Sequence, residues 1–306
     1  MLFQETGLMR LEDWNGNPWR TPERAAELLD RKFAYAFMSR GAGAIEWAWN
    51  INPYMPIDNE SVIGLFRPDG TAKPEFDVVR KFAEFFKAAA PYLDDYAPDP
   101  VVIVIPQSKL FMNRPAALDG YRRAVKVLAE RFGFVPTAIS DLRLTPARLR
   151  DAKLVIVPSA EFLSRDAIAA LATAKNVLYT GVATEDDPST PVRLHEGNAT
   201  FDRDLQEALR RTTRRLTESH EPLPLEYARE DEPLVALFAR ALNQQPLEKG
   251  VAMRVLEMPR ARLVIAVNET GSDAKRHIAG IDIGVAAGRS TLVLIDRATG
   301  SEITRR

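Results

Sequence analysis

The 306-residue chain contains no cysteine and only three histidines, His195, His220 and His277. Without cysteine there are no disulfides, no thiolate metal ligands, no thiol nucleophile and no iron–sulfur cluster. No two of the histidines stand at the spacing of metal ligands, so an all-histidine zinc site is not expected. The sequence therefore predicts neither a metal centre nor a bound cofactor.

An excess of charge of either sign is also lacking. Lysine plus arginine number 41 and aspartate plus glutamate 42, a net charge of -1. This balance gives no basic field for nucleic acid and no polybasic patch for a membrane surface. The longest apolar runs, such as Val101–Pro106, are too short to span a bilayer. The first residues, MLFQETG, do not resemble a signal peptide, so the expected location is the cytoplasm.

What is present is an ordinary globular composition, 46% hydrophobic and 27% charged. Three segments differ in texture, and prolines mark the joints between them. Residues 1–96 hold all four tryptophans, residues 98–220 alternate aliphatic strands with helices, and residues 222–306 begin with a helix and continue as strands. We expect each segment to form a domain.

The first segment predicts two β/α units. Met1–Glu5 is expected to be a strand, and Thr21 to cap a helix that ends near Ser39. Ala44–Asn50 is the second expected strand, and Pro74 begins the second helix after a long loop.

The second segment predicts a flavodoxin-like, doubly wound domain, because nearly continuous aliphatic strands between helices are typical of a parallel sheet covered on both faces. The expected strands are Val101–Ile105, Val135–Ile139, Leu154–Val157 and Val177–Thr180, and the expected helices are Pro115–Phe132, Pro146–Arg150, Ser164–Ala174 and one around Leu205–Thr213.

The third segment predicts a helix and then a small antiparallel β-sandwich, because short strands alternate with turn residues. The helix is expected over Glu232–Leu242, and the strands over Val251–Glu257, Arg262–Asn268, Lys275–Ile283 and Ser290–Asp296.

Candidate functional residues lie in the first segment. Glu5 stands at the end of a strand, where a carboxylate serves as a nucleophile or proton carrier, or merely pairs with an arginine. Trp47 and Trp49 share one face of the second strand and offer flat platforms for sugar rings, or else pack beneath helices. The polar loop 52–60 that follows is either functional or a solvated connection.

These features together carry a resemblance. Glu5-Thr6-Gly7 after a strand, a strand ending in Trp49-Asn50, and Asp69-Gly70-Thr71 leading to Lys73-Pro74 resemble the last two β/α units of a clan A glycoside hydrolase. The resemblance implies a partial (β/α)8 barrel and a hydrolysis reaction that retains the configuration of the anomeric carbon. Glu5 is then the nucleophile, Trp49 and Trp47 line the sugar subsite, and Asn50 binds hydroxyls.

The order of the three segments resembles the family 42 β-galactosidases, in which a glutamine-amidotransferase-like domain and a small β domain follow the barrel. The resemblance implies a homo-oligomer, a trimer by family analogy. Amidotransferase chemistry is excluded because the chain has no cysteine. Ser159 lacks the glycine-flanked turn of a serine hydrolase.

One departure concerns the acid/base glutamate, which in the clan follows an asparagine at the end of the fourth strand. That strand is absent from this chain, and Asn59-Glu60 and Asn268-Glu269 are interpreted as chance matches. We therefore expect a C-terminal part of a β-galactosidase-like enzyme that acts on a carbohydrate substrate together with an N-terminal barrel portion. Two alternatives remain: a non-catalytic oligomerisation scaffold and a carbohydrate-binding remnant.

Overall fold

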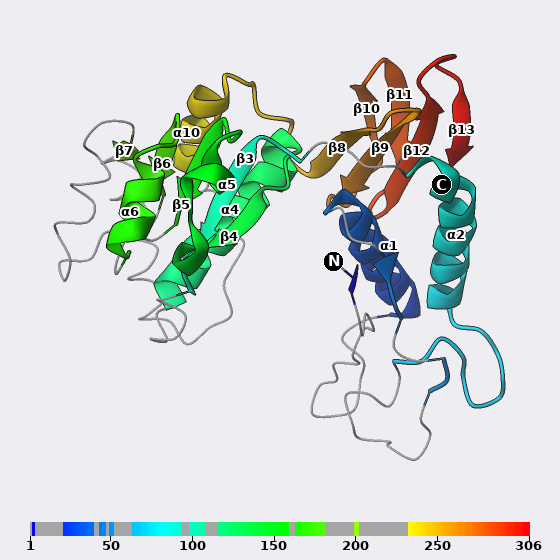
Figure 1. The fold of residues 1–306 in the computed structure, drawn as a ribbon. Coiled ribbons are helices and arrows are strands. Elements are labelled where there is room, and N and C mark those ends of the chain that lie inside the picture. Colours follow the sequence, from blue (N-terminus) through cyan, green and yellow to red (C-terminus); the bar gives the residue numbers. More distant parts are fainter. Residues whose placement is uncertain are drawn as a thin grey trace. The chain divides into compact units, whose positions relative to one another are not determined.

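A computed structural model of the chain describes residues 2–3, 21–39, 43–46, 49–51, 63–93, 98–107, 115–158, 163–180, 199–201 and 232–306 (Figure 1). The chain divides into two compact units. Unit 1 combines Met1–Ala97 with Lys249–Arg306, and unit 2 is Pro98–Glu248. The molecule is a mixed α/β protein that has both parallel and antiparallel sheets.

Unit 2 contains a five-stranded parallel sheet with strand order β4-β3-β5-β6-β7. Counted along the chain, this is the 2-1-3-4-5 order of flavodoxin-like folds, which confirms the predicted doubly wound class. The strands are β3 (Val101–Ile105), β4 (Thr137–Ser140), β5 (Leu154–Val157), β6 (Val177–Tyr179) and β7 (Ala199–Phe201).

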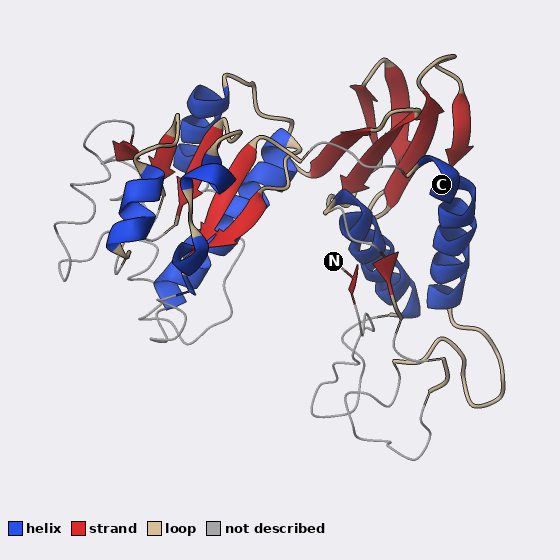
Figure 2. Ribbon diagram, viewed as in Figure 1, coloured by secondary structure: helices blue, strands red, loops and turns tan. Residues whose placement is uncertain are grey.

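Both faces of this sheet are covered by helices (Figure 2). Alternate residues along β5 enter two different cores: Val155 packs with α5 (Pro146–Leu149) and α6 (Arg165–Leu171). Ile156 packs with α4 (Pro115–Phe132) and α10 (Glu232–Leu242). Because both faces are buried, the strand reads as an unbroken aliphatic run. The predicted cap of α6 is confirmed, since the Ser164 hydroxyl accepts a hydrogen bond from Ala167 N at 3.1 Å.

Helix α10 belongs to unit 2, whereas the sequence suggested that it opens the third domain. The Phe132 and Phe238 rings meet edge to face at 6.1 Å, and Arg131 of α4 pairs with Glu232 at 3.0 Å. The apolar stripe of α10 thus covers the same face of the parallel sheet as α4 and packs beside that helix. The predicted helix around Leu205–Thr213 lies outside the described residues.

Unit 1 begins with the order predicted for two β/α units: β1 (Leu2–Phe3), α1 (Pro22–Met38), β2 (Gly43–Ala44) and α2 (Pro74–Ala89). The Thr21 hydroxyl caps α1 by accepting a hydrogen bond from Arg24 N at 3.2 Å, as predicted. Strand β2 ends at Ala44, whereas the sequence predicted a strand over Ala44–Asn50. Helices α1 and α2 pack together through aromatic rings, with Phe33 and Phe82 at 5.2 Å. Within the described residues, no helix has the length and hydrophobicity to cross a bilayer.

The C-terminal strands form two antiparallel sheets within unit 1. The larger has the order β13-β12-β9-β8, and the smaller is the hairpin β10-β11. The bounds are β8 (Val251–Glu257), β9 (Ala261–Asn268), β10 (Ala274–Ile278), β11 (Ile281–Val285), β12 (Ser290–Asp296) and β13 (Glu302–Arg305). The single strand predicted over Lys275–Ile283 is a hairpin, because Ala279 and Gly280 both take positive φ, as a two-residue turn requires. Strand β13 was not predicted.

The larger sheet is covered on both faces, and neighbouring residues of β12 mark the two sides. Ser290 bonds to Asp30 of α1, whereas the Thr291 hydroxyl donates to Gly284 O of the hairpin at 2.9 Å. Successive side chains of a strand point to opposite faces, so the helices and the hairpin lie on opposite sides of the sheet. The segment predicted as a free-standing sandwich is therefore integrated with the N-terminal helices.

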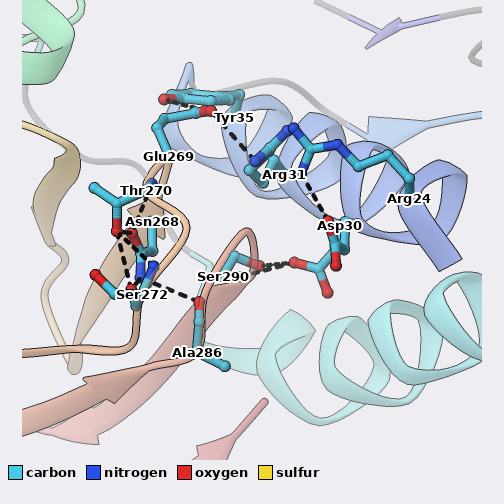
Figure 3. A network of polar contacts seen from close by, with 11 residues as sticks. Arg24, Asp30, Arg31, Tyr35, Asn268, Glu269, Thr270, Ser272, Ala286 and Ser290 are labelled. Atoms are coloured by element: carbon cyan, nitrogen blue, oxygen red, sulfur yellow. Dashed lines mark hydrogen bonds and ion pairs between the residues drawn. The ribbon is translucent and has the colours of Figure 1, made fainter. Parts of the chain in front are cut away.

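A buried ion pair joins α1 to the end of the chain. Asp30 and Arg306 are paired at 2.6 Å, and each side chain is 7% exposed. The Asp30 carboxylate also accepts from Ser290 N at 2.9 Å and from the Ser290 hydroxyl (Figure 3). The Arg306 guanidinium stacks on the Phe82 ring, 3.5 Å from its centroid. A buried charge is tolerated where it is paired and hydrogen-bonded, and these contacts supply both conditions.

A second polar group lies where α1 meets the segment after β9 (Figure 3). The Asn268 side chain is fully buried and accepts a hydrogen bond from Thr270 N at 2.9 Å. Glu269 accepts from the Tyr35 hydroxyl at 3.1 Å and pairs with Arg31 at 3.5 Å. Both residues of the Asn268-Glu269 dipeptide thus hold elements together, in keeping with its interpretation as a chance match.

Candidate functional site

The two short strands of unit 1 position the candidate site. Strands β1 and β2 are parallel and in register, with Leu2 opposite Gly43 and Phe3 opposite Ala44. The carboxyl ends of parallel strands lie at the same edge of a sheet, so the chain leaves both strands on one side. Glu5 follows β1 by two residues in the sequence but lies outside the described residues, as does Trp47.

Trp49 is a highly exposed aromatic residue of unit 1. Its side chain is 63% exposed. One part of the indole contacts the Phe66 ring, with centroids 4.7 Å apart, and Phe76 of α2 meets it edge-on at 6.2 Å. Phe66 and Phe76 are themselves 4.8 Å apart. The indole is therefore supported by two rings yet open to solvent, as an apolar binding platform requires.

The backbone around Trp49 is clamped by a crossing segment. The Trp49 carbonyl accepts hydrogen bonds from Leu65 N at 2.9 Å and Phe66 N at 3.0 Å. Gly64 lies against the Asn50–Ile51 peptide so closely that a Cβ there would be 2.1 Å from Asn50 C. Any larger residue at position 64 would push this peptide away. The clamp therefore holds Trp49 and the adjacent exposed Asn50 in one orientation.

The clamp is tied in turn to the start of α2. The Lys73 ammonium donates to Gly64 O at 2.9 Å and pairs with Glu75 at 2.9 Å. In the turn that precedes Lys73, the Asp69 carboxylate accepts hydrogen bonds from Thr71 N at 2.9 Å and from the Thr71 hydroxyl at 2.7 Å. These bonds lower the pKa of Asp69. The stretch from Asp69 to Lys73, which by resemblance leads into the last barrel helix, is thus a hydrogen-bonded turn that ends at Pro74.

Glu46 is an ionisable residue that sequence reasoning did not single out. Its Oε2 atom is buried and has no hydrogen-bond partner among the residues that the structure describes. Burial raises the pKa of Glu46 to about 8, outweighing the lowering by Lys32 and Lys73, and Glu75 adds to the rise. The side chain is therefore a neutral carboxylic acid at pH 7. The sequence feature that could have identified Glu46 is that it is the single carboxylate in the predicted strand Ala44–Asn50.

Glu46 and Trp49 point to different surroundings. Ile45 is 50% exposed and Trp49 63% exposed, whereas Glu46 is half-buried near Lys32 of α1 and Glu75 of α2. The Glu46 carboxyl group therefore lies near the two helices, whereas Ile45 and Trp49 are exposed apolar side chains.

The structure describes only some of the predicted site residues. Trp49 and Asn50 are adjacent and exposed, while Glu5, Trp47, Glu60 and Ser159 lie outside the described residues. In the part of the chain that the structure describes, no three acidic or histidine side chains gather as a metal site would need.

Comparison with known proteins finds relatives by structure alone. No protein-family model matches the sequence, and no curated protein matches it. The β-galactosidase from the psychrophilic Marinomonas ef1 matches with a TM-score of 0.61 and 12% identity, over 95% of this chain and 52% of its own. A catalytic mutant of Gan42B, a GH42 β-galactosidase from G. stearothermophilus, matches with a TM-score of 0.61 and 13% identity, over 96% and 53%.

The β-galactosidase from Bacillus circulans sp. alkalophilus gives a similar result, with a TM-score of 0.59, 10% identity and coverage of 96% and 55%. The chain shares the fold of the C-terminal part of GH42 β-galactosidases. It spans about half the length of these structures. At such identities the likeness establishes the fold alone, and the residues must argue the chemistry.

Proposed function

We propose that the chain is the C-terminal part of a retaining glycoside hydrolase, similar to the GH42 β-galactosidases, that acts on β-glycosides. The observation that carries the proposal is the exposed, ring-supported Trp49, which follows strand β2 by five residues in the sequence. Sugar rings present C–H faces that stack on such a surface. The likeness in fold to β-galactosidases adds the class of reaction.

In the proposed mechanism, the Glu5 carboxylate attacks the anomeric carbon while the bond to the leaving oxygen breaks. A proton reaches that oxygen from an acid/base glutamate outside these 306 residues. Water, deprotonated by the same glutamate, then hydrolyses the glycosyl ester with net retention. Trp49 and Trp47 form the wall of the sugar subsite, and Asn50 binds hydroxyls.

The decisive experiment is covalent trapping. The chain is incubated with an activated 2-deoxy-2-fluoro-β-galactoside, whose leaving group departs without acid assistance, and the adduct is located by peptide mass spectrometry. We expect the adduct on Glu5 and its loss in Glu5→Gln. An adduct on any other residue, or none at all, would overturn the nucleophile assignment.

The external acid/base group has its own test. We expect the purified chain not to turn over an aryl β-galactoside whose leaving group needs protonation. Turnover that disappears in Glu5→Gln would place both carboxylates within the 306 residues and contradict this part of the proposal. Trapping on Glu5 without turnover is the combination that we expect.

Carbohydrate binding without catalysis is a second candidate, favoured by the exposure of Trp49. It predicts that galactose binding weakens in Trp49→Ala and that the fluorosugar leaves no adduct. Phe86→Ala is the matched control, since Phe86 is an exposed aromatic residue on α2. We also propose that the chain assembles as a homo-oligomer, a trimer by family analogy, and light scattering distinguishes this from a monomer.

A further inference from the structure

Unit 1 contains a cavity that the proposed glycosidase site does not use. It has a volume of about 600 Å³ and lies between α1, α2, the β11–β12 connection and Arg306. Neither Glu46, Trp49 nor Asn50 lines it. Its volume falls in the range of small-molecule pockets.

The charged groups of the cavity wall are unequal in number. The wall carries three cationic side chains, Lys81, Arg289 and Arg306, and two carboxylates, Asp30 and Asp77. The side-chain charges therefore sum to +1. The wall also has an apolar part, formed by Ala26, Pro74 and Val78.

Both carboxylates already have cationic partners. Asp30 pairs with Arg306 at 2.6 Å and accepts two bonds from Ser290. Asp77 pairs with Lys81 at 2.7 Å and also with Arg80. Neither is left to neutralise a further cation of the wall.

The guanidinium group of Arg289 keeps unused hydrogen-bond donors. Among the described residues, this half-buried side chain has no hydrogen-bond or ion-pair partner. A guanidinium has five donors, and its planar fork matches carboxylate and phosphate groups. Spare donors of this kind in one cavity point to an anionic ligand.

We propose that this cavity binds a small organic molecule that carries a carboxylate or phosphate group, with Arg289 as the main donor to that group. Ala26, Pro74 and Val78 contact the apolar part of the ligand. The ion pair of Asp30 and Arg306 forms the polar wall beside it. This inference is independent of the glycosidase proposal, because the two sites share no residue.

The experiment is calorimetric titration of the full chain with glucuronate and with glucose 6-phosphate, and uncharged glucose serves as the control ligand. We expect at least one anion to bind and glucose not to bind in this cavity. Whichever anion binds more tightly identifies the preferred group. Failure of both anions at millimolar concentration would overturn the proposal.

Variants locate the binding in this cavity. Arg289→Gln is expected to weaken anion binding about tenfold, the loss typical of one charge-assisted hydrogen bond. Arg305→Gln is the matched control, because Arg305 is exposed, pairs with Glu302 and does not line the cavity. Equal weakening in both variants, or none in Arg289→Gln, would contradict the assignment. Unchanged thermal unfolding of Arg289→Gln shows that the loss is local.

Discussion

Unit 1 and unit 2 differ in the contacts that join their own helices and strands. In unit 2, the parallel sheet lies between two apolar cores built from residues of neighbouring β/α segments. In unit 1, helices from the first hundred residues meet strands from the last sixty, and buried charges lie at the junction. An apolar core accepts many side chains of suitable volume, whereas each member of a buried ion pair needs the opposite charge of the other member.

The buried arginines of unit 1 illustrate this selectivity. Arg254 of β8 is fully buried and donates to the Met38 carbonyl at the end of α1. Arg306 reaches Asp30 two turns earlier on the same helix. Each contact demands one position of α1 on the sheet, because a shift would leave a buried charge without its partner. These two buried arginines thus fix the position of α1 on the sheet of unit 1.

The largest expected effect tests the ion pair. Arg306→Ala leaves the Asp30 carboxylate buried without its cation, and we expect a loss of about 3–5 kcal/mol in the free energy of unfolding of unit 1. Hydrogen exchange of the β12 amides measures it, because this readout is specific to that unit. Arg305→Ala, which removes an exposed pair with Glu302, should cost less than about 1 kcal/mol.

A double variant checks the cause. Asp30→Asn with Arg306→Met removes both charges and keeps an acceptor for Ser290 N. It should recover at least half of the stability lost in Arg306→Ala. A double variant as unstable as Arg306→Ala would show that the loss comes from packing on Phe82, and the contrast between the units would weaken.

The second effect concerns pH. The pKa of Glu46 is about 8 in the folded chain and 4.5 ordinarily, so the folded state holds this proton more tightly. Its contribution to stability is complete below about pH 4.5 and is lost as the pH rises through 8. Glu46→Gln stays neutral, and we expect its advantage over the natural chain to grow from pH 5 to pH 9. Linkage alone gives about 4 kcal/mol, and partial exposure to solvent reduces the expected gain to roughly 2 kcal/mol.

Denaturant titrations at several pH values measure this difference. Glu84→Gln is the matched control, because Glu84 is an exposed carboxylate on α2 that pairs with Arg80. Parallel pH profiles for the natural chain and Glu46→Gln would rule out a neutral, buried Glu46.

A smaller effect is expected in unit 2. Ile156→Val removes one methyl group from the fully buried β5, and we expect a cost of about 1 kcal/mol. The amides of β5 should exchange faster while those of β12 are unchanged. Equal acceleration in both strands would show that the units unfold together.

The smallest effect is predicted at Trp49. Because its side chain is 63% exposed, Trp49→Ala should change the free energy of unfolding by less than about 0.5 kcal/mol. Galactose binding, followed by intrinsic fluorescence, should nevertheless weaken. Stability loss of several kcal/mol without a change in binding would make Trp49 a core residue and remove the platform on which the proposed function rests.

Several elements of both units match their predicted bounds, including β8 and β12 of unit 1. Strands β3 and β5 and helices α4 and α10 match their predicted bounds, because both faces of the sheet are buried and the aliphatic runs are unbroken. In unit 1, the strand predicted over Lys275–Ile283 is divided at Ala279, an alanine with a positive φ that local sequence does not favour.

The candidate site divides in the same way. The alternation of residues predicted that Trp47 and Trp49 share one strand face, since period and residue type are local properties. Trp49 is exposed in the structure, and its role as a sugar platform stays a prediction. The raised pKa of Glu46 was not predictable, because it depends on burial between the sheet segment and two helices. The spare donors of Arg289 likewise emerged only once its surroundings were known.

The sequence by itself determined the α/β class, the flavodoxin-like sheet and the exclusion of thiol chemistry, because these follow from composition and short-range periodicity. The tertiary structure decided that α10 joins unit 2 and that the last strands pack on α1 and α2. Asp30 and Arg306 are 276 residues apart, and no local pattern reports so distant a partner. The buried pair is stable only when both charges meet, which the folded chain alone achieves.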